Sequence, residues 1–139
     1  MFLFSKEIQH LDALENLTHL YLGKNKITKI QNLDNIKKLQ CLSLQNNRVV
    51  KIENLDALVN LTELYVSENG IEKLENLENN TKLETLDVAK NRIKAIENIK
   101  HLVLIEEFWV RDTVSCLSNL KANLLVFFSS SNYRQMIMK

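Results

Sequence analysis

The segment "IEEFWVRD" at residues 105–112 contains residue types that often bind a protein partner. Trp109 is the only tryptophan of the chain, and Glu106 and Glu107 stand just before it. An exposed tryptophan among carboxylates suits a basic protein surface, because an aromatic ring buries a large area at low entropic cost. Whether Trp109 is exposed depends on the register of its strand, and the preceding sequence sets that register.

Catalytic chemistry has no comparable support in the sequence. The three histidines show no metal-ligand spacing with the two cysteines. The chain contains two glycines in all, so it has no Gly-rich loop for a phosphate group. Glu106 and Glu107 are adjacent, and in a strand adjacent side chains point to opposite faces. We therefore expect no enzyme, no metal and no cofactor.

Composition and charge narrow the class of protein. The chain has 139 residues, 45% hydrophobic residues and 25% charged residues, which is typical of one soluble globular domain. The net charge of +1 gives no reason to expect binding to nucleic acid or to an anionic membrane. No apolar stretch is long enough for a signal peptide or a membrane span. Cys41 and Cys116 are far apart in the sequence, and we expect both to be reduced thiols.

A 22-residue repeat dominates the chain. Four consecutive copies cover residues 17–104 and share the template LxxLxLxxNxIxxIxxLxxLxx. The four copies contain 4 × 7 = 28 apolar slots, and Asn80 alone breaks the pattern. This periodicity is typical of a solenoid in which each copy forms one coil, and the template resembles a leucine-rich repeat.

The spacing within each copy predicts the structure of a coil. The LxL core should form a short strand with its leucines inward, and successive strands should stack in parallel about 4.8 Å apart. The remaining apolar slots lie three residues apart, which suits tight 3₁₀ or helical turns on the convex side. The predicted fold class is therefore α/β: a leucine-rich repeat solenoid with strands on the concave face.

Two asparagine positions recur in every copy, and we interpret both as structural. A buried turn leaves backbone groups that need partners, and stacked amides can supply donors and acceptors to neighbouring coils. The first column consists of Asn25, Asn47, Asn69 and Asn91. The second column consists of Asn32, Asn54, Asn76 and Asn98.

The two ends of the chain fit the template less well. Residues 1–110 are expected to form one solenoid, with a partial first coil, the four full repeats and the start of a further one. In the partial coil we expect Lys6 in the asparagine slot. Residues 111–139 follow no template. They are either a divergent C-terminal tail from alternative splicing or gene-model readthrough, or a makeshift cap with the helical stripe Leu117, Leu120, Leu124 and Phe128.

Positions between the inward leucines face the concave surface and carry no core duty. The central column reads Tyr21, Ser43, Tyr65, Asp87 and Trp109. The neighbouring column reads His19, Cys41, Glu63, Thr85 and Glu107. Acidic residues outnumber basic ones on this face, whereas the basic residues gather after the strands, as Lys26, Lys29, Arg48, Lys51, Lys73, Arg92 and Lys94. We expect Trp109 to point outward in a protein-binding surface; the alternative is a surface that is merely solvated.

Three strings are more specific than the template: "ENLTHLYLGKNKITKIQNLD", "LTELYVSENGIEKLENLENNTKLETLDVAKNRIKAIENIKHL" and "EEFW". Over roughly residues 8–110 the chain resembles the protein phosphatase 1 regulatory subunit 7 family, which is built of 22-residue leucine-rich repeats. The resemblance implies a non-enzymatic regulator or inhibitor that binds the type-1 Ser/Thr protein phosphatase catalytic subunit through an acidic and aromatic concave face. It also implies inhibitor 3 as a further partner, roles in phosphatase maturation and mitosis, and a location in nucleus and cytoplasm. We expect a monomer outside that complex. The matching positions are Tyr21, Glu63, Tyr65, Asp87, Glu107 and Trp109.

Two other functions remain open. The generic template is shared with bacterial internalins, which favour proline in the turn, and with a spliceosomal partner protein. The chain contains no proline. A structural scaffold that binds a helix of a ribonucleoprotein component would use the same repeat. A truncated product without a stable function is the third interpretation, since the resembled family has further repeats on both sides.

Overall fold

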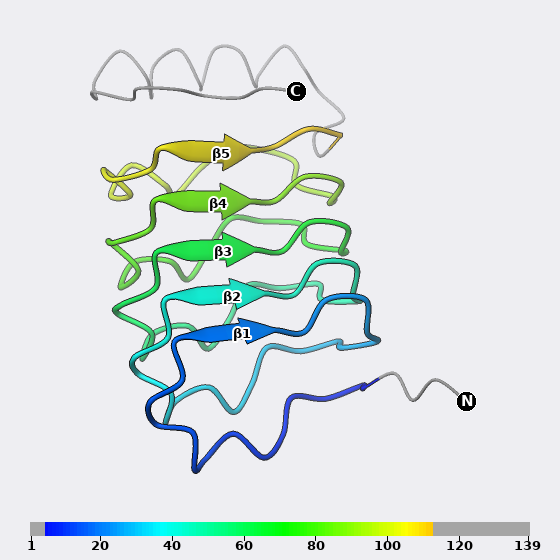
Figure 1. The fold of residues 1–139 in the computed structure, drawn as a ribbon. Helices are drawn as coiled ribbons and strands as arrows, with labels where there is room; N and C mark the ends of the chain where they lie inside the picture. Colours follow the sequence, from blue (N-terminus) through cyan, green and yellow to red (C-terminus); the bar gives the residue numbers. More distant parts are fainter. Residues whose placement is uncertain (1–4, 113–139) are drawn as a thin grey trace.

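The computed structural model describes residues 5–112, which form a solenoid of stacked coils (Figure 1). Each coil contributes one three-residue strand to a single parallel sheet, and the strands follow one another in chain order. The strands are β1 (His19–Tyr21), β2 (Cys41–Ser43), β3 (Glu63–Tyr65), β4 (Thr85–Asp87) and β5 (Glu107–Trp109). The predicted parallel solenoid is confirmed.

Equivalent repeat positions pair across the sheet. Leu64 lies opposite Leu42 on one side and Leu86 on the other, and Phe108 continues the row on β5. These inward side chains are buried in one continuous core. In the first full repeat Leu20 is only partly buried. A solenoid coil is covered by its two neighbours, and the partial coil before this repeat contributes no strand within the described residues.

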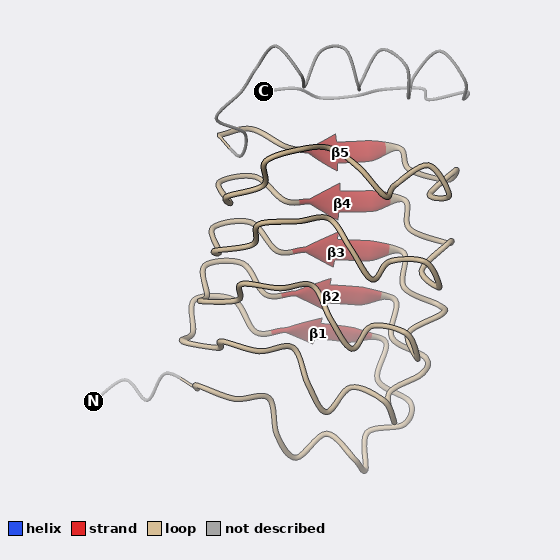
Figure 2. Ribbon diagram, turned by 180° about the vertical axis from the view of Figure 1, so that it is seen from behind, coloured by secondary structure: helices blue, strands red, loops and turns tan. Residues whose placement is uncertain are grey.

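The convex side is made of turns, which cross in front of the strands in the rear view of Figure 2. The N–H groups of Ile36 and Leu39 donate to the carbonyl oxygens three residues earlier, at 3.1 and 3.0 Å. Leu58 and Leu61 repeat this arrangement one coil later. Each turn closes separately, and no helix forms within residues 5–112. The helical component of the predicted fold is therefore reduced to single tight turns.

The first asparagine column bonds the backbone of two coils at once. The Asn69 Nδ2 donates to the carbonyl oxygens of Val66 and Ser67 in its own coil, at 3.0 and 3.1 Å, and to that of Leu44 in the preceding coil at 2.9 Å. Its Oδ1 accepts from the Val49 N–H at 2.9 Å. Asn47 and Asn91 repeat these contacts in their own coils.

The second asparagine column has a conformational role that the spacing did not indicate. Asn54 has a φ of 57°, in the left-handed region, and its Nδ2 donates to the Ile30 carbonyl oxygen at 2.7 Å. Asparagine tolerates this region better than most residues, because its short side chain can bond locally. Equivalent positive φ angles and equivalent bonds occur at Asn32, Asn76 and Asn98.

The register of the first coil differs from the prediction. The Ser5 N–H donates to the Asn25 Oδ1 at 3.0 Å, which is the contact that Ile27 makes with Asn47 one coil later. Ser5 therefore aligns with Ile27, and the asparagine slot falls on residue 3, outside the described residues. The placement of Lys6 in that slot was wrong, because it did not keep the 22-residue step.

Asn80, the exception to the apolar pattern, is completely buried. Its Nδ2 donates to the carbonyl oxygens of Leu55 and Leu58, each at 3.0 Å. Its Oδ1 is the one buried side-chain atom of the described residues without a hydrogen-bond partner. Unsatisfied buried polar atoms are destabilising, so this oxygen reduces the stabilisation that the two amide bonds provide.

We expect Asn69→Ala to lower the free energy of unfolding by about 3 kcal/mol, because backbone groups in two coils lose their partner together. Denaturant unfolding followed by circular dichroism measures this loss. Asn79→Ala, at an exposed position, is the matched control and should change stability by less than about 0.5 kcal/mol. Equal effects of the two substitutions would contradict the assigned role of the column.

We expect Asn80→Leu to raise the free energy of unfolding by about 1 kcal/mol, since it removes an unpaired buried oxygen and fills an apolar slot. The equivalent positions in other coils already hold Ile36, Leu58 and Leu102, so the slot accommodates the side chain. A denaturant melt of both proteins, analysed for midpoint and slope, measures the gain. A loss of stability would mean that the two amide bonds outweigh the unpaired oxygen.

Candidate protein-binding surface

The concave face carries a row of three large polar or aromatic side chains. Tyr65, Asp87 and Trp109 are direct neighbours on β3, β4 and β5. All three are partly exposed, whereas Phe108 and Val110 on either side of Trp109 are buried. The strand register therefore directs Trp109 away from the core, as the alternation predicts.

A carboxylate lies beside each end of this row, two residues before Tyr65 and two residues before Trp109. The Tyr65 hydroxyl donates to the Glu63 carboxylate at 3.0 Å. Burial and this carboxylate raise the pKa of Tyr65 well above its ordinary value, with a smaller contribution from the Glu107 charge. Glu63, Thr85 and Glu107 form a second row of paired positions beside the first. The structure thus brings together five of the six predicted residues.

Tyr21 lies apart from the other predicted residues. Its side chain is 68% exposed and stacks against His19, with ring centroids 6.4 Å apart. Ser43 separates it from Tyr65, because Ser43 pairs with a tyrosine on each side.

The β2 positions differ from the expectation of an open concave surface. Ser43 and Cys41 are both buried, because they are small residues beside large side chains on the adjacent strands. Cys41 carries a free thiol whose pKa is raised by burial, and a hydrogen bond with Cys41 raises the pKa of Tyr21. Cys116 lies outside the described residues.

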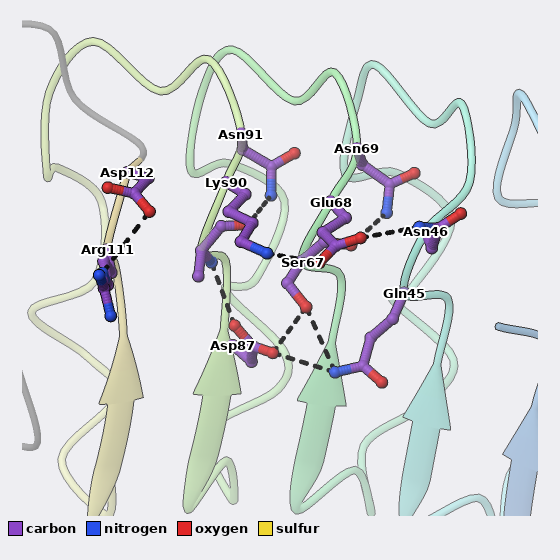
Figure 3. A network of polar contacts seen from close by, with 11 residues as sticks. Gln45, Asn46, Ser67, Glu68, Asn69, Asp87, Lys90, Asn91, Arg111 and Asp112 are labelled. Atoms are coloured by element: carbon purple, nitrogen blue, oxygen red, sulfur yellow. Dashed lines mark hydrogen bonds and ion pairs between the residues drawn. The ribbon is translucent and has the colours of Figure 1, made fainter. Parts of the chain in front are cut away.

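The carboxylate of Asp87 is held in a hydrogen-bond network across three coils (Figure 3). Its Oδ2 accepts from the Ser67 hydroxyl at 2.7 Å and from the Gln45 Nε2 at 3.1 Å. Its Oδ1 accepts from the Ala89 N–H at 3.1 Å. These bonds fix the direction of the carboxylate, so Asp87 is held in one defined orientation on the concave face.

A second polar ladder runs along the rim where the strands end (Figure 3). The Glu68 carboxylate accepts from the Asn46 Nδ2 and the Lys90 Nζ, each at 2.7 Å. The bond from Lys90 lowers the pKa of Glu68, and the same bond raises the pKa of Lys90. Glu68 and Lys90 thus neutralise each other, so Glu68 adds little net negative charge to the face.

The rim residues share an uncommon backbone conformation, with φ between 53° and 56° at all five of them. Only non-glycine residues occupy it here: Lys24, Asn46, Glu68, Lys90 and Asp112. A hollow of about 370 Å³ opens beside this rim over the first three coils. Of the six predicted residues, only Tyr21 lines it. Polar residues of the Asp87 network and of the rim recur 22 residues apart. This spacing is a sequence signal that could have identified both sets of contacts.

Two other kinds of functional feature are a metal centre and a membrane-spanning helix. Residues 5–112 contain no group of three His, Cys, Asp or Glu side chains able to hold a metal ion. A membrane-spanning helix is not found in the part of the chain that the structure describes.

We expect Tyr65 to remain protonated at a pH where an ordinary tyrosine has ionised. The folded state holds this proton more tightly than the unfolded chain does. The resulting stabilisation is complete below about pH 10 and decreases as the pH rises towards the folded-state pKa. Tyrosinate absorbance during an alkaline titration measures this, with Tyr65→Phe identifying the signal. Glu63→Gln should reverse only part of the shift, since burial is the larger cause.

Comparison with known proteins finds a matching repeat family and solved structures with a similar fold. A model for leucine-rich repeats in two copies matches residues 15–57, 37–79 and 59–101. No curated protein matches the chain by sequence. An internalin C2 from Listeria monocytogenes is 30% identical with a TM-score of 0.78, and the match covers 94% of this chain and 55% of that one.

A second internalin (inlF) from the same organism is 29% identical with a TM-score of 0.72, over 86% of this chain and 34% of that one. A leucine-rich repeat protein of Leptospira interrogans has the same fold at 19% identity and a TM-score of 0.67, over 88% of this chain and 38% of that one. The chain thus spans about a third to about half of these structures. From the repeat match and the shared solenoid it follows that the chain belongs to the leucine-rich repeat family.

Proposed function

We propose that the chain is a non-enzymatic regulatory module that binds the type-1 Ser/Thr protein phosphatase catalytic subunit through its concave face. The observation that carries the proposal is the row of Tyr65, Asp87 and Trp109 on three adjacent strands. These are the positions at which the chain resembles the protein phosphatase 1 regulatory subunit 7 family. Leucine-rich repeat proteins generally act by binding other proteins, which supports the coarser part of the proposal.

The chemistry of the row suits a basic surface with an apolar pocket. Trp109 supplies a large ring for a pocket, and such anchors commonly account for most of the binding energy of an interface. Glu63 and Glu107 flank the row and can pair with lysine or arginine of the partner. Asp87 is pre-oriented by its three hydrogen bonds, which lowers the entropic cost of binding.

The proposal extends to the setting in which such a module acts. Inhibitor 3 would be a further component of the complex, and the complex would occur in nucleus and cytoplasm. These assignments follow from the family resemblance and not from the geometry. A structural scaffold for a ribonucleoprotein component is the alternative, since the internalin structures show that the same fold occurs in other classes of protein.

We expect the purified chain to co-elute with the phosphatase catalytic subunit, and Trp109→Ala to weaken the complex by about 2–4 kcal/mol, or roughly 30- to 1000-fold in Kd. Size-exclusion chromatography and calorimetric titration measure both results. Val103→Ala is the matched control, because Val103 is an exposed apolar residue outside the strands, in the repeat that precedes Trp109. The control should bind as the parent does.

A thermal melt of each protein separates binding from folding. If a cooperatively folded parent fails to bind the phosphatase, the proposal is wrong and the scaffold alternative gains support. If Trp109→Ala and Val103→Ala bind equally well, the concave row is not the binding site. Glu107→Lys provides a second variant at an exposed position, where a folding defect is not expected.

A further inference from the structure

The basic residues that follow the strands form a surface of their own, here called the basic flank: Lys26, Lys29, Arg48, Lys51, Lys73, Arg92 and Lys94. They belong to the chain segments that follow the strands, and these segments lie beyond the arrowheads in Figure 1. Equivalent positions are stacked because the coils are hydrogen-bonded at this point. The Arg48 N–H donates to the Ile27 carbonyl oxygen at 2.8 Å, and Arg92 bonds Ile71 in the same way. Stacked side chains therefore start about 4.8 Å apart.

Three lysines of the flank form no ion pair within the described part of the chain. Lys29, Lys51 and Lys73 occupy the same position in three successive coils, are exposed, and form no ion pair within residues 5–112. The Lys94 Nζ lies 3.9 Å from the Glu72 carboxylate, and both side chains are exposed. Three stacked cations repel one another in the absence of an anion, so this surface favours an acidic ligand.

An apolar centre lies within the basic flank. Val50, between Arg48 and Lys51 in the sequence, is 61% exposed. Gly70 is the residue of the next coil that corresponds to Arg48. A Cβ added to Gly70 would lie 3.4 Å from the Val50 Cγ1. Gly70 thus leaves one side of Val50 uncovered. An exposed apolar side chain ringed by charges is the arrangement of a small protein-binding surface, with a central contact and a charged rim.

We propose that the basic flank binds an acidic helix of a partner protein, at a site separate from the concave face. The spacing of the stacked lysines matches the rise of an α-helix. Two coil steps, from Lys29 to Lys73, span about 10 Å. Seven residues of an α-helix span about 10.5 Å, so carboxylates at helix positions i, i+3 or i+4, and i+7 meet three successive lysines. An extended peptide carries same-face side chains about 6.7 Å apart and loses register after one step.

Nucleic acid fits this surface less well than a helix does. Duplex DNA presents one charge about every 1.7 Å and is held by many cations. The basic flank offers three stacked lysines and an apolar centre, on a chain whose net charge is only +1. An acidic helix uses the apolar centre as well as the lysines, because one apolar side chain beside the acidic stripe can contact Val50.

The test uses a fluorescein-labelled helical peptide with glutamates at i, i+4, i+7 and i+11 and leucines beside that stripe, titrated with the full chain and followed by anisotropy. Charge reversal at Lys29, Lys51 and Lys73 to Glu should weaken binding at least about tenfold. The matched control reverses Lys6, Lys37 and Lys100, which are exposed lysines outside the basic flank and give the same change in net charge. The control should alter Kd less than about threefold.

Further binding measurements distinguish the proposed acidic helix from other negatively charged ligands. A peptide of the same composition with scattered glutamates should bind at least about tenfold more weakly, because it cannot meet three lysines from one face. The proposal is overturned if both peptides bind equally, or if a single-stranded RNA of equal charge binds more tightly. It is also overturned if the two triple reversals have equal effects. Self-association that disappears on reversing the flank would also overturn it, since a second copy would then be the occupant. Co-elution with the phosphatase is scored separately, so failure of either proposal leaves the other testable.

Discussion

Buried backbone in the turns is the constraint on which this solenoid depends. Each coil turns sharply after its strand while its peptide groups are shielded from water, and those groups must find partners. The stacked amides of Asn47, Asn69 and Asn91 supply donors and an acceptor to two coils at a time. The ladder therefore fixes both the path of each turn and its height above the previous coil. The core leucines can then stack in register, because the polar ladder has already aligned the coils.

The same alignment produces the candidate binding surface. Since the inward positions are occupied by the core, the positions between them form straight rows across the sheet. Tyr65, Asp87 and Trp109 come from segments 22 residues apart, yet they are neighbours because the register does not slip. A second set of side-chain bonds, from Ser67 and Gln45 to Asp87, ties adjacent rows together. Binding geometry on this face is therefore a property of the repeat rather than of any single loop.

Much of this arrangement could be predicted from the sequence, because strand alternation and the 22-residue step are strict. The outward direction of Trp109 and the structural use of the asparagines followed from those two rules. Three features did not follow, since each depends on side-chain size or backbone angle. Ser43 and Cys41 are covered by larger neighbours, although their positions face outward. The left-handed residues, such as Lys24 and Glu68, include types that do not signal a positive φ. The bonds of Asp87 depend on which side chains reach it, and a template does not specify this.

The repeated bonding between coils also has a consequence for how such a protein can change in length. Every coil presents to the next the same donors and acceptors, 22 residues apart, as the matching bonds of Asn47, Asn69 and Asn91 show. Removing or adding one whole coil therefore rejoins chemically equivalent edges and leaves no peptide group without a partner. The concave face can lengthen or shorten in increments of about 4.8 Å. The length of a binding surface on this fold is therefore set by the number of repeats and does not require a change in the repeat itself.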